Sequence, residues 1–136
     1  MNYSIFGKTG KKVSNLGMGG MRFDKGISED DCAEFIRLAN RLGINYFDTA
    51  PMYNEDRSED IYGRALQNMP KDFYIATKGQ NHLTADEVRR TIEKSLKRLK
   101  VDKIDFYFLW CIISIDQYHK AREKGQIMEG ISKAKE

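Results

Sequence analysis

The sequence has few of the features that would place it in a membrane or on a nucleic acid. None of its apolar runs approaches the roughly 18 residues that span a bilayer, and the first residues, MNYSIFGKTGKKV, contain no signal-peptide core. The 23 basic and 20 acidic residues leave a net charge of only +3, too small to indicate a polyanionic partner. A chain of 136 residues can form one domain with a real core, so we expect residues 1–136 to be a single domain.

Cysteine and histidine are also scarce, and this argues against a metal site. The two cysteines, Cys32 and Cys111, are far apart and match no metal-ligand spacing. They are typical of the reduced, buried cysteines of cytosolic proteins. We therefore expect a cytoplasmic protein without a bound metal.

What the sequence does contain is a repeating order of short apolar strand, loop and amphipathic helix. Residues 3–14 predict a hairpin, because a polar turn with two glycines, GKTG, separates two short strand-like segments. Further strands are predicted to start near residues 16, 44, 73 and 104, an interval of about 30 residues that fits a βαβ unit. The helices expected between and after them cover about 28–42, 58–68, 84–100 and 115–124. A last apolar fragment, Gln126–Ile131, is a candidate fifth strand.

Alternation of strands and helices predicts an α/β fold with a parallel sheet. Four or five such units make half of a (β/α)₈ barrel, which needs about 250 residues, or a small doubly wound sheet. The periodicity alone does not choose between them. The first strand–helix junction, GMGGMRF, lacks the GxGxxG fingerprint, which disfavours a dinucleotide-binding Rossmann half.

Polar side chains follow the predicted strands at the end where parallel sheets bind ligands. Asp48 ends the second strand, Tyr53 lies in the loop after it, and Lys78 ends the third. A nearby ammonium favours the ionised form of a phenol, and an aspartate paired with the lysine would hold that ammonium in place. Such a tyrosine can act as a general acid towards a carbonyl oxygen. Each residue also has an ordinary structural interpretation as loop cap, packed aromatic or surface lysine, and spacing alone leaves both open.

Five segments carry a more specific pattern: FGKTGKKVSNLGMGGMRF, GINYFDTAPMYNEDRSEDIYGRAL, FYIATKG, VRRTIEKSLKRLKVDKIDFYFLW and KAREKGQI. Together they resemble the N-terminal half of an aldo/keto reductase, over nearly the whole chain. The resemblance implies a partial (β/α)₈ TIM barrel of about four to five βα units, preceded by a hairpin that closes its bottom. It also implies reduction of aldehydes or ketones to alcohols with NADP(H).

The resemblance assigns roles to the polar residues at the strand ends. Asp48 in FDTA, Tyr53 in PMY and Lys78 in ATKG match the family's catalytic aspartate, proton-donating tyrosine and lysine. Gly20 and Met21, together with Asp48, match positions near the nicotinamide end of the cofactor.

Trp110 stands where the family's fourth catalytic residue, a histidine, is expected. An indole donates one hydrogen bond but cannot exchange a proton in the working pH range. We therefore expect Trp110 to line the substrate pocket rather than to transfer a proton.

The chain stops near the middle of the family's barrel, and this leaves two hypotheses. The first is an NADP(H)-dependent oxidoreductase that acts on a small carbonyl substrate. The second is a non-catalytic half-barrel remnant that binds or oligomerises without turnover. Because a half barrel exposes unpaired strand edges, we also expect a possible homo-oligomer in which two copies complete the barrel.

Overall fold

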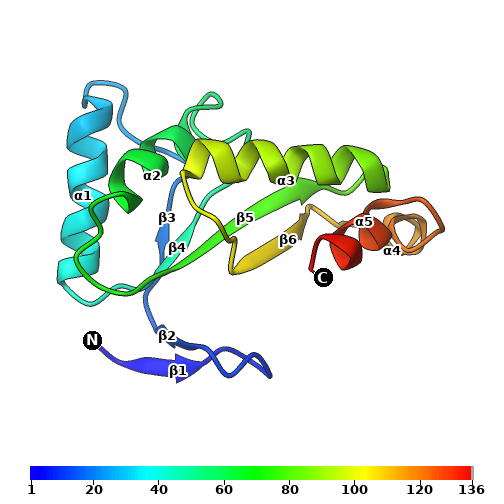
Figure 1. Ribbon diagram of the computed structural model, residues 1–136, viewed down its shortest axis with the longest axis horizontal. Helices are drawn as coiled ribbons and strands as arrows, with labels where there is room; N and C mark the ends of the chain where they lie inside the picture. The colour runs from blue at the N-terminus through cyan, green and yellow to red at the C-terminus, as the bar shows by residue number, and fades with distance from the viewer. Residues whose placement is uncertain (136) are drawn as a thin grey trace.

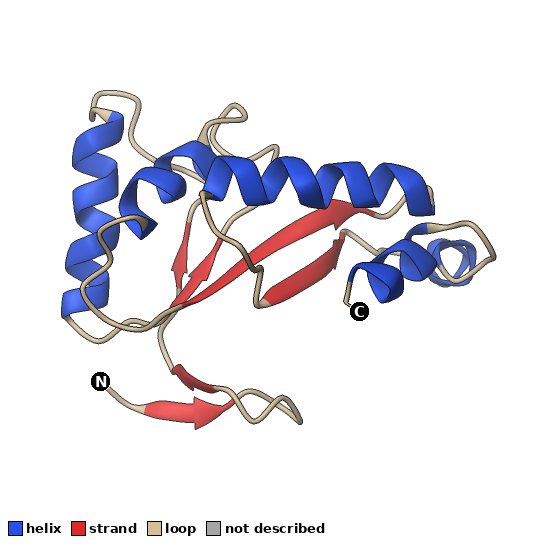
Figure 2. Cartoon of the chain, in the orientation of Figure 1, coloured by secondary structure: helices blue, strands red, loops and turns tan. Residues whose placement is uncertain are grey.

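A computed structural model describes residues 1–135, which form a hairpin followed by a parallel sheet with helices on one face (Figure 1). The strands are β1 (Tyr3–Ile5), β2 (Lys12–Ser14), β3 (Met18–Gly19), β4 (Tyr46–Asp48), β5 (Tyr74–Gln80) and β6 (Phe106–Trp110). The helices are α1 (Glu29–Arg41), α2 (Ser58–Leu66), α3 (Ala85–Leu99), α4 (Ile115–Ala121) and α5 (Ile127–Ala134). In the orientation of Figures 1 and 2, α2 and α3 lie above the sheet, α1 lies to its left, α4 and α5 lie to its right, and the hairpin lies below it.

The sheet has the strand order β3-β4-β5-β6, with every neighbouring pair parallel. Consecutive strands in one continuous order are the arrangement of a (β/α)₈ barrel, whereas a doubly wound sheet reverses its order at a switch point. The fold is therefore half of a barrel, built from four βα units, and the predicted fold class is confirmed.

The candidate fifth strand at Gln126–Ile131 is wrong, because this segment begins helix α5. Ile127 and Gly130 are buried and Ile131 is partly buried, a spacing of three to four residues that puts them on one helical face. Ile127 packs against Val88 of α3 in a small apolar cluster. The apolar residues of this fragment thus follow the period of a helix, which a six-residue fragment was too short to reveal.

Capping explains where two of the main helices begin. Ser28 accepts a hydrogen bond from the Asp31 amide at the start of α1, and Thr84 forms a capping box with Glu87 at the start of α3. The start of α2 is different, because Ser58 lies inside the helix and its hydroxyl pairs with Thr49 Oγ1 instead, 2.7 Å away. This hydrogen bond between Ser58 and Thr49 matters for the site described below.

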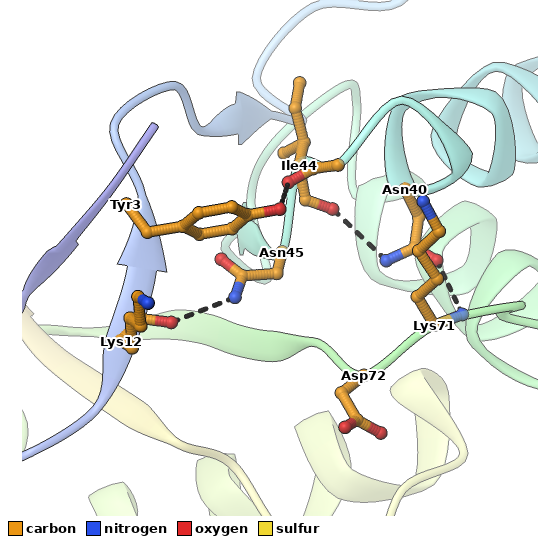
Figure 3. Close-up of a pocket in the computed structure, with 8 residues that line it drawn as sticks. Tyr3, Lys12, Asn40, Ile44, Asn45, Lys71 and Asp72 are labelled. Atoms are coloured by element: carbon orange, nitrogen blue, oxygen red, sulfur yellow. Dashed lines mark hydrogen bonds between the residues drawn. The ribbon is translucent and has the colours of Figure 1, made fainter. Parts of the chain in front are cut away.

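A cavity of about 300 Å³ lies where the hairpin meets the bottom of the sheet (Figure 3). Tyr3 Oη donates to the Gly43 carbonyl at 2.9 Å, and Asn45 Nδ2 donates to the Lys12 carbonyl at 3.0 Å. These hydrogen bonds attach the hairpin to the sheet.

Aromatic rings fill the inner face of the sheet above the hairpin. Phe6, from the hairpin turn, lies 4.6 Å from the ring of Phe106 and 5.9 Å from that of Tyr46, between centroids. Lys11 adds an ion pair of 3.1 Å with Asp105. The hairpin therefore plugs the bottom of the half barrel, and the opposite end remains for chemistry.

The two cysteines differ in their surroundings. Cys32 is buried as predicted, but the prediction that Cys111 is buried is wrong, because it is exposed. It follows the end of β6 with a left-handed φ of 62°, and its carbonyl accepts a hydrogen bond from Asn81. Within residues 1–135, no helix has both the length and the apolar character required to cross a bilayer.

Candidate active site

The alternation of side chains along β4 and β5 brings Asp48 and Lys78 together at the carboxyl end of the sheet. Lys78 Nζ donates to Asp48 Oδ1 and also to the Thr49 carbonyl, at 2.9 Å for the latter. The side chain of Lys78 is only 11% exposed and that of Asp48 is 28% exposed. The ion pair is thus partly shielded from water, where electrostatic interactions are stronger than at a surface.

Tyr53 reaches the same place from the loop between β4 and α2. Its ring lies beside Lys78, with 4.9 Å between Nζ and the ring centroid, a cation–π distance. Two backbone bonds fix its place: its N–H donates to the Ala50 carbonyl, and its carbonyl accepts from the Ser58 N–H. The structure therefore brings together all three residues that the sequence nominated for catalysis.

A cavity of about 440 Å³ opens beside Tyr53. Its walls include Met21 and Phe23 from the loop after β3, Tyr53, and Trp110 from the end of β6. Lys25 and Glu55 form an ion pair at its exposed edge. Trp110 and Tyr53 therefore line the same cavity.

Gly20 lies next to this cavity but is buried, and its N–H donates to the Asp48 carbonyl at 2.8 Å. A Cβ on Gly20 would come within 2.3 Å of Ser58 Oγ and 2.5 Å of the Tyr62 ring. Only a residue without a side chain therefore fits where the chain passes the start of α2. Met21, in contrast, is 51% exposed.

Neither of the two histidines lies at this site. His82 and His119 are both exposed, and neither lines the cavity beside Tyr53. No group of three or more potential metal ligands comes together among residues 1–135.

Asp48, Tyr53 and Lys78 form the rim at the carboxyl end of the sheet. The sequence interpretation missed a buried polar layer behind this rim. Thr49 and Thr77 follow and precede the two rim residues in the chain, so their side chains point to the opposite face of the sheet. There they contact Ser58 and Glu59 at the start of α2. The period-two alternation of the strands contained the signal for this layer.

The fold and the rim together define a class of protein: the first half of a (β/α)₈ barrel with an Asp–Lys pair and a tyrosine at its carboxyl end. The chain belongs to the aldo/keto reductase family, whose sequence model matches residues 15–134.

Two curated relatives illustrate the similarity. The chain is 40% identical to an L-galactose dehydrogenase of Arabidopsis thaliana over 111 residues, which cover 73% of this chain and 34% of the relative. It is 30% identical over 127 residues to an NADH-specific methylglyoxal reductase of Escherichia coli, covering 74% of this chain and 39% of the relative. The chain thus spans well under half the length of these relatives.

The solved structures agree with the fold. A putative aldo-keto reductase from Pseudomonas aeruginosa superposes with a TM-score of 0.81 at 30% identity, over 98% of this chain and 54% of that one. The four βα units described above therefore correspond to about half of that solved chain.

Proposed function

We propose that this chain carries the acid–base part of an NADP(H)-linked reductase of aldehydes or ketones. The observation that supports it best is the position of Lys78 Nζ, bonded to Asp48 and lying beside the ring of Tyr53. Tyr53 donates its phenolic proton to the carbonyl oxygen of the substrate. The Lys78 ammonium, held by Asp48 and the Thr49 carbonyl, stabilises the phenolate that remains.

The remaining walls of the cavity suit a small carbonyl substrate. Trp110 and Phe23 offer ring surfaces, and the indole N–H of Trp110 is a hydrogen-bond donor without acid–base function. We propose that Trp110 orients the substrate in the pocket, while Tyr53 supplies the proton.

We propose that Gly20, Met21 and Asp48 hold the nicotinamide end of the cofactor, which supplies a hydride to the carbonyl carbon when bound. The exposure of Met21 beside the cavity supports this proposal. The buried position of Gly20 means that it would contribute only through its backbone. The choice of NADP(H) rests on the family resemblance, and the E. coli relative named NADH-specific makes a parallel test with NADH necessary. A cytosolic location is part of the same proposal, supported by two unpaired cysteines.

We also propose that the free edges of the sheet pair with a second copy of the chain. The sheet order begins at β3 and ends at β6, and a cavity of about 460 Å³ along β6 is lined by Ile104, Phe106 and Phe108. Pairing β6 of one copy with β3 of another would complete eight parallel strands and remove both edges. The mass in solution tests this: a discrete species of twice 15.8 kDa supports it, and a monomer or a broad aggregate contradicts it.

Calorimetric titration with NADPH, and separately with NADH, tests the reductase proposal. We expect saturable binding of NADPH. The absence of any heat of binding up to about 1 mM cofactor, which corresponds to a very weak affinity, would contradict the proposal for this chain. That result would favour the non-catalytic half barrel.

The role of Tyr53 has its own test. Tyr53→Phe keeps the ring beside Lys78 and removes the proton donor, so aldehyde-dependent oxidation of NADPH should fall by a factor of about 100 or more. Tyr118→Phe removes an exposed hydroxyl on α4 that is bonded to Arg122, just after the helix. It is the matched control and should leave the rate unchanged. An unaltered rate in Tyr53→Phe would remove Tyr53 from its proposed role.

A further inference from the structure

The start of α2 contacts the two strands that carry the Asp48–Lys78 pair, from the face opposite the rim. Ser58 Oγ lies 2.7 Å from Thr49 Oγ1, and Thr77 Oγ1 donates to Glu59 Oε1 at 2.8 Å. All four of these side chains are fully buried. Thr49 and Thr77 are the immediate chain neighbours of Asp48 and Lys78, and the Thr49 carbonyl itself accepts a hydrogen bond from Lys78 Nζ.

Glu59 is an expensive residue for this position. Burial raises the pKa of its carboxyl group, and the nearby Ser95 and Thr77 hydroxyls and the Arg98 guanidinium only partly oppose that rise. Within residues 1–135, its Oε2 atom has no hydrogen-bond partner of ordinary geometry and lies 3.5 Å from Arg98 Nη1. Apolar residues fill buried layers at lower cost than a partly satisfied ion pair, so its position points to a task other than stability.

Arg98 extends the same network to the loop that carries Tyr53. Its Nη1 atom donates to the Pro51 carbonyl at 3.3 Å, two residues before Tyr53, while Nη2 binds Asp60 at 2.9 Å. The Ser58 N–H, in turn, donates to the Tyr53 carbonyl at 3.2 Å. The buried layer therefore contacts the chain next to each of the three proposed catalytic residues.

We propose that Ser58 and Glu59, acting through Thr49 and Thr77, are positioning residues that hold Asp48 and Lys78 in contact at the rim. Thr49 and Thr77 are covalently bonded to Asp48 and Lys78 and direct their side chains to the opposite face, so anchoring them limits the movement of Asp48 and Lys78. The catalytic meaning of this arrangement rests on the proposed function, but the positioning itself can be measured without turnover.

The test is the rate at which an amine-specific acetylating reagent modifies Lys78, followed by mass spectrometry on the whole chain. In the natural chain the reaction is slow, because Nζ is bonded to Asp48 and the Thr49 carbonyl. Thr77→Val removes the bond to Glu59 with little change in shape. We expect Lys78 to react about fivefold faster, since a hydrogen bond to a charged or buried group contributes an effect of that order or larger.

Three matched variants sharpen the result. Thr91→Val removes a hydroxyl that bonds only to the Glu87 carbonyl on α3 and should leave Lys78 unchanged. Glu59→Ala should raise the rate like Thr77→Val. Glu59→Gln keeps an acceptor for Thr77 and should restore the slow reaction.

Lys11, paired with Asp105 at the other end of the sheet, is the internal reference. Unchanged Lys78 reactivity in both Thr77→Val and Glu59→Ala overturns the proposal, and so does an equal rise at Lys11, because that indicates general loosening. If the natural chain turns over, Thr77→Val should lower kcat and leave KM unchanged. If it binds no NADPH, the proposed function fails while the labelling result still decides the positioning.

Discussion

Lys78 shows how one side chain at the rim depends on contacts from several elements. Its ammonium is bonded to Asp48 and the Thr49 carbonyl from β4 and the residue after it, and it lies beside a ring from the following loop. A lysine left alone with this little exposure would lose hydration without compensation. The aspartate and the carbonyl replace that hydration beside the ring of Tyr53.

At the same scale, Glu59 predicts how stability varies with pH. The pKa of its carboxyl group is raised in the native state by burial, so the native state binds more protons than the unfolded state once the pH passes the ordinary value. The contribution of Glu59 to stability therefore falls as the pH rises from 4.5 through the native pKa. Because glutamine does not titrate, the free energy of unfolding of Glu59→Gln should rise relative to that of the natural chain over this pH interval. Urea denaturation at a series of pH values measures the difference.

Glu34→Gln is the control with the opposite sign. Hydrogen bonds from Arg41 and Arg37 lower the pKa of Glu34, so the natural glutamate adds stability that is lost as the pH falls through the native pKa. Relative to the natural chain, this variant should weaken as the pH rises. If the stability of Glu59→Gln relative to the natural chain falls with rising pH, the Glu59 carboxyl group does not have a pKa raised by burial.

At the scale of elements, α2 and α3 lie unusually close, and Gly63 permits it. A Cβ on Gly63 would meet the Arg98 carbonyl oxygen at 2.0 Å. Alanine is intrinsically the better helix former, yet Gly63→Ala should lower the free energy of unfolding by about 2–3 kcal/mol, since backbone atoms would have to separate.

Chemical denaturation measures this effect, with Gly19→Ala as control because a Cβ there meets nothing within 4 Å. Equal stabilities for the two variants would contradict the close approach. If α2 is pushed away from α3, Lys78 should also become more reactive, because Arg98 and Glu59 belong to the two helices.

The elements differ in how far the sequence could predict them. The hairpin, the four strands and the meeting of Asp48 with Lys78 follow from period and from the rule that parallel strands present ligands at one end. Ser58 is of a residue type that often caps helices, but its hydroxyl contacts Thr49 across a tertiary interface, and local patterns carry no information about such partners. The same limit applies to Gln126–Ile131, whose helical form is stabilised by packing on α3.

At the scale of the whole molecule, the inner face of β6 is the surface on which completion of the barrel depends. Phe108 belongs to the aromatic cluster of that face and lies along the free edge. Phe108→Lys should place a charge at the edge strand, and such charges oppose edge-to-edge pairing of strands. The variant should therefore convert a two-copy species into single chains in sedimentation experiments.

Ile113→Lys, at a position 79% exposed beyond the end of β6, makes the same chemical change away from the edge and should preserve the mass. If both variants keep the natural mass, β6 is not the contact. Far-UV circular dichroism on each variant separates dissociation from unfolding.

Trp110 is the only tryptophan in the chain, and it lines the cavity at the rim. The intrinsic fluorescence excited in the tryptophan band therefore comes from one indole at the proposed site, with no label and no background from a second. A change in its emission wavelength reports on the polarity of this cavity, whereas loosening of the hairpin plug at the far end leaves it unaltered. The protein thus carries a built-in optical probe that distinguishes events at its two ends.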